Sequence, residues 1–241
     1  MSEKNTMVTA RSGWVSPDYN TSCHVTLDPR HLEESRCVGY FPNEPELAAY
    51  KLLRTQLLQG LREQKRNVVM VTSSRPGEGK TLTAINLSLT LAREFSQTVL
   101  LVDADLRKPM IHRYLGYESE RGLGDCLAKG VSLAELTVWP GVEKLTVISG
   151  GNGSPYDSSE LLGSPVMQAL VREVRERYAD RLVIFDLPAV LDGDDALTFA
   201  PFADSIVFVV EAHRTQLSDV TKAIDMLPMD KLAGMVLNRY P

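Results

Sequence analysis

From residue 67 onward, short apolar runs alternate with longer segments in which apolar positions recur at helical spacing. The apolar runs are nearly continuous, as in parallel strands that are covered on both faces. They span residues 67–72, 98–102, 144–148, 181–185, 204–210 and 234–238. The helical patterns span residues 81–95, a glycine-punctuated stretch through 128, 164–178, 194–201 and 216–227. Because parallel strands need crossovers of helix length, this alternation predicts a doubly wound α/β fold. We expect a mainly parallel sheet of about six or seven strands with helices on both faces.

The region before the first apolar run divides into two parts. Residues 1–40 are polar, contain Gly13, Pro17 and Pro29, and show no sustained period, which predicts a partly disordered N-terminal arm with one short ordered stretch at 38–41. A helix follows, with Pro45 in its first turn and an end at residues 60–65. Its apolar positions are Leu47, Tyr50, Leu53, Leu57 and Leu61. We therefore expect one folded domain over residues 41–241.

Composition narrows the class of protein. Hydrophobic residues make up 44% and charged residues 24% of the 241 positions, which excludes a wholly disordered chain, a collagen-like fibre and a coiled-coil rod. A net charge of -5 argues against electrostatic binding of nucleic acid or of an anionic membrane by the protein as a whole. Three scattered cysteines favour a reducing compartment. With no apolar stretch suited to a signal peptide or a membrane span, we expect a cytoplasmic protein, attached to the inner membrane only through a partner.

The strongest chemical signal is a phosphate-binding loop between the apolar run 67–72 and the helical pattern 81–95. Gly77 and Gly79 allow backbone N–H groups to approach phosphate oxygens, and the start of the helix adds its positive end. Lys80 would contact the β- and γ-phosphates, and Thr81 would offer its hydroxyl to Mg²⁺. The standard loop begins with glycine where this chain has serine, so the match is to a variant form. The residues expected to bind ATP are Ser74, Arg75, Pro76, Gly77, Glu78, Gly79, Lys80, Thr81 and Leu82.

Two further apolar runs end in acidic residues. Residues 98–102 lead to Asp103 and Asp105, and residues 181–185 lead to Asp186. The carboxyl ends of strands in open α/β sheets face the ligand, so these carboxylates are expected beside the triphosphate. Asp105 and Asp186, together with the threonine of the loop, are the predicted Mg²⁺ ligands, and one carboxylate could accept a proton from an attacking hydroxyl.

These motifs, read in order as SSRPGEGKT, LLVDADLRKP and VIFDLP, resemble those of the bacterial tyrosine kinases of capsule and exopolysaccharide loci. That family is related to the partition and division-site ATPases. Other segments are similar as well, namely AYKLLRTQLL, SSELLGSPVMQAL, DDALTFAPFADSIVFVVEAHRTQ and GMVLNRY. The resemblance covers about residues 46–240. It implies that Lys80, Asp103, Asp105 and Asp186 are catalytic, and that Asn238 hydrogen-bonds adenine.

The chain departs from the family pattern in two places. Family members usually carry a C-terminal cluster of tyrosines that neighbouring subunits phosphorylate, whereas this sequence ends with Asn-Arg-Tyr-Pro. The family's first helix carries Glu, Arg and Arg that organise a ring of subunits, where this chain has Ala48, Lys51 and Arg54. We expect the ring interface to be weakened or rebuilt. Arg75 stands where the partition ATPases carry a lysine that reaches a neighbour's phosphate, and it either does the same or is simply solvated.

Four functions therefore remain open. The first is an ATP-dependent protein-tyrosine kinase, with Asp103 assisting removal of the tyrosine proton. The resemblance implies that it forms a homo-oligomer or ATP-dependent dimer and depends on the cytosolic tail of a membrane chain-length or export protein. The second, which the sequence supports nearly as well as the first, is an ATPase of the same fold whose nucleotide cycle regulates polysaccharide assembly. The third is a partition-type ATPase, and the fourth a nucleotide-binding scaffold without turnover.

Overall fold

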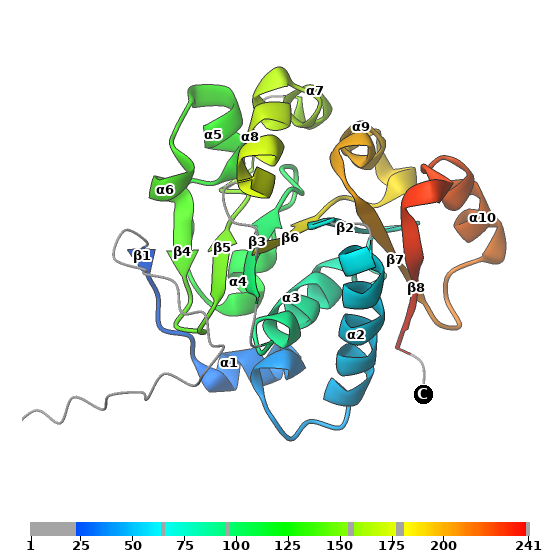
Figure 1. Ribbon diagram of the computed structural model, residues 1–241, viewed down its shortest axis with the longest axis horizontal. Helices are drawn as coiled ribbons and strands as arrows, with labels where there is room; N and C mark the ends of the chain where they lie inside the picture. Colours follow the sequence, from blue (N-terminus) through cyan, green and yellow to red (C-terminus); the bar gives the residue numbers. More distant parts are fainter. Residues whose placement is uncertain (1–22, 64–65, 95–96, 154–156, 177–180, 240–241) are drawn as a thin grey trace, which may run out of the picture.

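The computed structural model describes residues 23–63, 66–94, 97–153, 157–176 and 181–239. One sheet organises this part of the chain, with helices on both of its faces (Figure 1). Its strands are β1 (Cys23–His24), β2 (Val68–Ser73), β3 (Thr98–Asp103), β4 (Thr137–Trp139), β5 (Leu145–Ile148), β6 (Arg181–Asp186), β7 (Ser205–Glu211) and β8 (Leu232–Asn238). The α-helices are α1 (Pro29–Glu34), α2 (Leu47–Glu63), α3 (Lys80–Leu91), α4 (Ile111–Leu115), α5 (Leu123–Lys129), α6 (Leu133–Leu136), α7 (Ser158–Leu162), α8 (Pro165–Glu176), α9 (Asp195–Phe199) and α10 (Leu217–Asp225).

The strand order is β1-β4-β5-β3-β6-β2-β7-β8, and every neighbouring pair is parallel except β4 and β5. The predicted doubly wound α/β fold is confirmed. All six predicted strands are present, as β2, β3, β5, β6, β7 and β8. The antiparallel strand β4 and the two-residue strand β1 were not predicted, because each is too short to show a period.

Two hydrophobic cores lie on opposite faces of the sheet. In β2, Val68 and Met70 belong to one core while Val69 and Val71 belong to the other, as the alternation of side chains along a strand requires. Helices α2 and α3 cover one face, and α8 and α9 cover the other (Figure 1). Because the central strands are buried on both faces, any charged side chain at their ends depends on partners.

Order begins earlier in the chain than the sequence pattern predicted. Of the expected N-terminal arm, residues 23–40 form β1, α1 and a 3₁₀ turn, Val38–Tyr40. Leu32 and Cys37 are fully buried in the core beneath α3, and the Gly39 N–H donates to Asn86 Oδ1 at 2.9 Å. The expectation that residues 38–41 would be the one ordered stretch of the arm was wrong for residues 23–37, because Leu27, Leu32 and Cys37 are buried in the core although their spacing shows no period. Residues 1–22 lie outside the described residues.

Among the helices that the structure describes, none is long and apolar enough to cross a lipid bilayer. The expected ligand-binding edge of the sheet is where the carboxyl ends of β2, β3, β6, β7 and β8 meet.

Candidate nucleotide-binding and catalytic site

The predicted phosphate loop connects β2 to α3 at the middle of the sheet. Gly77 and Gly79 both have positive φ, at 88° and 94°, so the backbone there turns in a way that favours glycine. Among the described residues, the N–H groups from Gly77 through Thr81 have no hydrogen-bond acceptor. A run of free N–H groups ending at a helix start is a ready site for a phosphate group.

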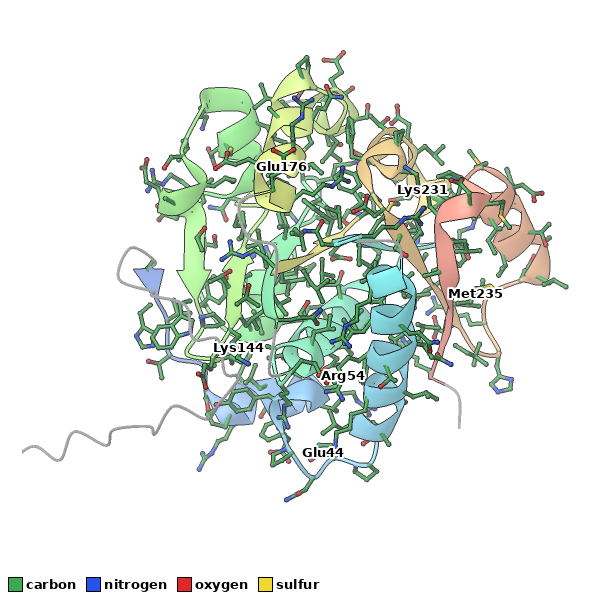
Figure 2. The ribbon with its side chains drawn as sticks, in the orientation of Figure 1. Glu44, Arg54, Lys144, Glu176, Lys231 and Met235 are labelled. Carbon is green, nitrogen blue, oxygen red and sulfur yellow. The ribbon has the colours of Figure 1, made fainter. Side chains whose placement is uncertain are left out.

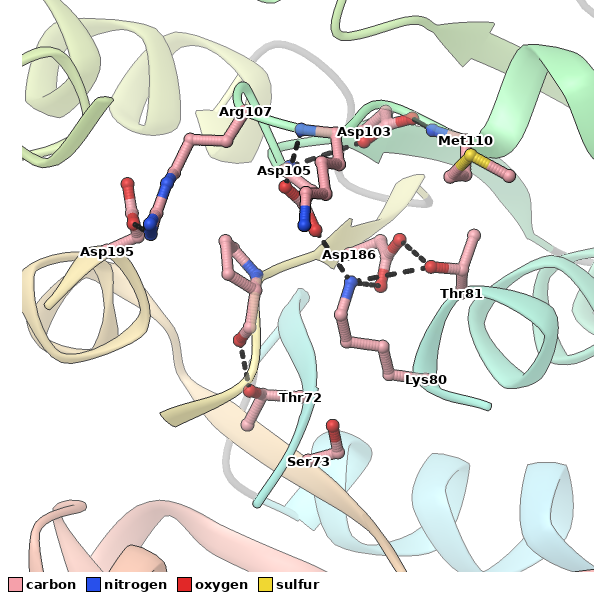
Figure 3. Close-up of polar contacts among 12 residues, drawn as sticks. Thr72, Ser73, Lys80, Thr81, Asp103, Asp105, Arg107, Met110, Asp186 and Asp195 are labelled. Atoms are coloured by element: carbon pink, nitrogen blue, oxygen red, sulfur yellow. Dashed lines mark hydrogen bonds and ion pairs between the residues drawn. The ribbon is translucent and has the colours of Figure 1, made fainter. Parts of the chain in front are cut away.

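Lys80 lies between two of the predicted carboxylates (Figure 3). Its Nζ is 3.0 Å from Asp105 Oδ2 and 3.5 Å from Asp186 Oδ1. Burial lowers the pKa of Lys80, but the charges of Asp186 and Asp105 outweigh burial and raise the pKa above its ordinary value. The lysine is therefore charged, and it lies beside the loop N–H groups that phosphate oxygens would approach.

The donor set beside this lysine suits a magnesium ion. The Thr81 hydroxyl donates to Asp186 Oδ2 at 2.6 Å, which brings one hydroxyl and one carboxylate together. Asp186 Oδ1 is buried and accepts no hydrogen bond among the described residues, and its close contact is the ion pair with Lys80. This oxygen could therefore bind a cation or a metal-bound water. Oxygen ligands of this kind are those that Mg²⁺ prefers, and the bound ion would neutralise phosphate charge. Thr81 and Asp186 thus suit the predicted metal site, whereas Asp105, which contacts Lys80 and accepts the Lys108 N–H, stays a predicted ligand.

Asp103 and Asp105 were predicted as a similar pair, but the structure gives them different surroundings. Asp103 Oδ2 accepts the N–H groups of Met110 and Ile111 at 2.8 and 2.9 Å, and Oδ1 accepts that of Asp105 at 3.2 Å. Asp103 therefore holds the start of α4, whereas Asp105 contacts Lys80. Burial, together with the nearby charge of Asp186, raises the pKa of Asp103 to about 8.

The register of the sheet explains why these carboxylates meet. Asp103 at the end of β3 is paired directly with Asp186 at the end of β6. Strand β6 in turn pairs with β2, which leads into the phosphate loop. Because β3, β6 and β2 are adjacent and parallel, Asp103, Asp186 and the phosphate loop all lie at the same edge of the sheet, as predicted.

The remaining predicted loop residues serve different parts of the site. Ser74 is buried, and its N–H donates to the Glu78 carboxylate at 2.8 Å. Leu82 packs against the core on the α3 side of the sheet, so its backbone rather than its side chain faces the loop. Pro76 lines a cavity of about 370 Å³ beside the loop, together with residues of the segment that follows β7.

The Arg75 side chain pairs with α10, while its backbone N–H donates to Glu78 within the loop. Its Nε and Nη2 donate to the two carboxylate oxygens of Asp219 in α10, each at 3.0 Å. Asn238, predicted to bind adenine, donates from Nδ2 to the backbone oxygen of Glu78 at 2.9 Å. The structure places both residues beside the loop, while their roles toward a neighbouring subunit and toward adenine stay predictions.

Several residues that support the site were not predicted. Thr215 and Asp219 contact the loop from the segment after β7, and Asp195 of α9 pairs at 3.3 Å with Arg107, which follows the acidic motif. The strand-end rule that identified the three aspartates applies equally to the polar residues after β7. The order of the strands, which places β7 beside β2, could not be derived from the sequence alone.

Comparison with known proteins assigns the family. The ParA family model, described as NUBPL iron-transfer P-loop NTPase, matches residues 64–238. The tyrosine-protein kinase YwqD of Bacillus subtilis is 35% identical over 191 residues, which cover 78% of this chain and 79% of that protein. The chain belongs to the bacterial tyrosine kinase family. The resemblance seen in the motifs is therefore confirmed.

Other members of this family are larger or have solved structures. The putative tyrosine-protein kinase EpsB of Ralstonia nicotianae is 33% identical over 199 residues, and the chain spans 26% of its length. The chimerical protein CapA2B2 matches with a TM-score of 0.78 at 27% identity, covering 94% of this chain and 95% of that one. The kinase domain of the Escherichia coli tyrosine kinase ETK matches with a TM-score of 0.77 at 27% identity, covering 85% and 82%. The cell division ATPase MinD of Pyrococcus furiosus, at 23% identity and a TM-score of 0.58 with 72% of each chain covered, shares the fold.

Proposed function

We propose that this chain is an ATP-dependent protein-tyrosine kinase of the bacterial type that regulates exopolysaccharide or capsule synthesis or export. The observation that carries the proposal is the buried group of Lys80, Thr81, Asp105 and Asp186 at the start of α3, which combines one cation, one hydroxyl and two carboxylates. A relative supports the role in polysaccharide synthesis as well as the phosphate chemistry. The succinoglycan biosynthesis transport protein ExoP of Rhizobium meliloti is 34% identical over 199 residues, and the chain spans 24% of its length.

The proposed roles follow from position and charge. Lys80 stabilises the charge that develops on the transferred phosphoryl group, and Thr81, Asp105 and Asp186 hold Mg²⁺. Asp103, paired with Asp186 at the adjacent strand end, assists removal of the tyrosine proton, as the family resemblance implies. Asn238, at the end of β8, binds adenine.

The tyrosines that the structure describes are poorly placed as phosphate acceptors. Tyr40, Tyr50, Tyr114 and Tyr117 are all partly buried, and the hydroxyl of Tyr117 is buried with no hydrogen-bond partner among the described residues. Burial raises the pKa of both Tyr50 and Tyr117, which makes these hydroxyls harder to deprotonate. We therefore propose that the acceptor is a tyrosine other than these four, such as one on a separate protein or one of Tyr19, Tyr156, Tyr178 and Tyr240.

The proposed partner is the cytosolic tail of a membrane polysaccharide chain-length or export protein, which would hold this cytoplasmic chain at the inner membrane. Homo-oligomerisation is part of the proposal, although the ring motif is altered. Arg54 is engaged within its own chain, where Nη2 lies 3.0 Å from Glu94 Oε1 and Nη1 donates to Thr90 O at 3.2 Å. Those contacts support a subunit interface that differs from the one the family motif implies.

A second candidate is an ATPase of the same fold that regulates polysaccharide assembly without transferring phosphate to tyrosine. The partial burial of all four described tyrosines favours it. A partition-type ATPase is disfavoured by the net charge of -5, which opposes binding to DNA.

Mass spectrometry after incubation with ATP·Mg²⁺ separates the two candidates. The purified chain is incubated alone and with a candidate tail peptide, and ADP release is followed in the same samples. A kinase yields phosphotyrosine at positions outside the described residues or on the added peptide. ADP release without phosphotyrosine in any sample would favour the ATPase, and phosphate on Tyr117 would contradict the role assigned to the buried tyrosines.

A further inference from the structure

Glu78 is a buried carboxylate inside the phosphate loop itself. Its side chain is 3% exposed, although the loop is expected to receive an anionic ligand. A carboxylate at such a position is unfavourable unless its oxygens are satisfied, because burial removes the water that would solvate its charge. The partners of its two oxygens therefore indicate what the side chain does.

Both oxygens of Glu78 are occupied by groups of the protein. Oε2 accepts the N–H groups of Ser74 and Arg75 at 2.8 and 3.1 Å. Oε1 accepts the hydroxyl of Thr215 at 2.6 Å, and the Ser74 hydroxyl lies 3.2 Å from both oxygens. The carboxylate thus takes the first two amide hydrogens of the loop, which would otherwise point to solvent or ligand.

This arrangement divides the loop into two halves. In the first half, the N–H groups of Ser74 and Arg75 bind Glu78, and Pro76 has no N–H to offer. In the second half, the N–H groups from Gly77 through Thr81 have no acceptor among the described residues. An internal anion therefore holds one half of the loop in shape while the other half stays available to phosphate oxygens.

Glu78 also connects the loop to the outer part of the sheet. Thr215, its hydroxyl partner, follows β7 and accepts the N–H of Glu211 at 3.1 Å. The backbone oxygen of Glu78 accepts Asn238 Nδ2 at the end of β8. Three neighbouring strand ends, those of β2, β7 and β8, thus meet at one residue.

We propose that Glu78, held by Thr215, is a positioning residue that preforms the phosphate loop for nucleotide binding. The proposal rests on the proposed nucleotide site, but it concerns binding and does not depend on where the phosphate is transferred. Glu78 acts as an acceptor of hydrogen bonds, and its negative charge is not itself required. Thr215 contributes through Glu78 and has no separate contact with the nucleotide.

Variants at the two positions distinguish this role from others. Glu78→Gln keeps one oxygen for the Ser74 and Arg75 N–H groups, whereas Glu78→Ala leaves both without an acceptor. Thr215→Val removes the hydroxyl with little change of shape, and Thr215→Ser restores it. Thr221→Val is the matched control, because Thr221 lies in α10 just after the segment of Thr215 and its hydroxyl donates to Leu217 O at 3.0 Å rather than to the loop.

The readouts are the Kd for ADP·Mg²⁺ and the KM and kcat for ATP turnover, with circular dichroism to verify folding. Glu78→Ala is expected to raise Kd and KM about tenfold with a smaller effect on kcat, because two buried donors lose their acceptor. Thr215→Val is expected to raise Kd about threefold, and Glu78→Gln, Thr215→Ser and Thr221→Val less than that. The double variant Glu78→Ala/Thr215→Val is expected to match Glu78→Ala alone, as coupled residues do.

Two results would overturn the proposal. If Glu78→Gln impairs binding as much as Glu78→Ala, the charge itself is needed and a positioning role is wrong. If the effect of Thr215→Val adds fully to that of Glu78→Ala, the two residues act independently. The wild-type chain is measured for nucleotide binding in the same series. If it binds ADP·Mg²⁺ but transfers no phosphate to tyrosine, the proposed kinase function is wrong while the role of Glu78 can still be tested.

Discussion

The central strands and the outer strand β8 contribute to the site in opposite ways. Every residue of β2 and β3 is buried, whereas most of β8 is exposed, including Met235 at 61% and Leu237 at 53% (Figure 2). Strands β3 and β6 end in buried carboxylates that depend on partners outside the sheet: Asp103 accepts backbone N–H groups, and Asp186 faces Lys80. Strand β8 carries no charged residue and offers the site one amide, that of Asn238.

This contrast indicates where the chain tolerates change. A buried charge is stable only with a partner, so a substitution at Lys80, Asp105 or Asp186 alters both the chemistry and the balance of charge. On β8 the side chains of Met235 and Leu237 face solvent, so a change at either position removes little contact. We therefore expect effects on function to fall steeply from the middle of the sheet to its edge.

Among the positions on the sheet, the largest effect is expected at Asp186 at the end of β6. Asp186→Asn keeps the size of the side chain and a partner for the Thr81 hydroxyl, but removes the charge that faces Lys80 and Mg²⁺. ATP turnover should fall about 10- to 100-fold, as it does when a group that orients a bound metal is lost. Titration of ADP binding with and without Mg²⁺ checks the cause, because the variant should lose most of the wild-type dependence on Mg²⁺. An unchanged dependence would mean that Asp186 does not serve the metal.

Gly79 tests the contact between the loop and β8. A Cβ at Gly79 would overlap the side-chain amide of Asn238, in addition to the strain of its positive φ. Gly130 is the matched control, since its φ is also positive, at 71°, but its Cβ would meet open space. In denaturant titrations, both Gly→Ala changes should lower the free energy of unfolding by about 1–2 kcal/mol. Only Gly79→Ala should weaken ADP·Mg²⁺ binding, by about tenfold. Equal affinities in the two variants would show that this approach of β8 is not needed for binding.

These contacts also show how far the sequence could predict the molecule. The periodicity identified β2, β3, β6 and the helix after the loop, because long apolar runs and an uninterrupted helical pattern are strong signals. It could not identify the packing of Leu32 and Cys37, which come from a segment too short and irregular to show a period. The motifs placed Lys80 and the three aspartates at one edge of the sheet.

Contacts between segments that are distant along the chain could not be predicted from the sequence. The difference between Asp103 and Asp105 depends on where the chain turns into α4, and the pair of Arg75 with Asp219 depends on β7 lying beside β2. Both follow from strand order and loop path, which local patterns do not determine. Glu78 was expected to bind the nucleotide as part of the motif, while its internal hydrogen bonds emerge only in the folded loop.

A smaller effect is expected at Arg75. If its guanidinium serves a neighbouring subunit's phosphate, Arg75→Ala slows ATP turnover several-fold without weakening nucleotide binding. Arg214 is the matched control, because it is an exposed arginine beside the same loop that pairs with Glu211 at 3.3 Å. Arg214→Ala should leave both quantities unchanged. Equal losses of turnover and binding in Arg75→Ala would contradict a role across subunits.

The smallest effect is expected on β8. Met235→Ser should change the free energy of unfolding by about 0.5 kcal/mol or less and leave ATP turnover unchanged. Met70 in β2 is its buried counterpart, and Met70→Ser should lower stability by about 2–5 kcal/mol. Thermal or denaturant unfolding of the two variants measures the difference. Similar losses of stability would show that β8 is covered by another part of the protein in solution.

The most direct measurement is the transfer of labelled γ-phosphate from ATP·Mg²⁺ to protein tyrosine by the wild-type chain and by Lys80→Met, with ADP release followed in both. The buried group around Lys80 predicts labelled tyrosine in the wild type and a loss of about 100- to 1000-fold in both label and ADP in the variant. Label that is equal in the two proteins, or ADP release by the wild type without any labelled tyrosine, would contradict a tyrosine kinase that works through this group.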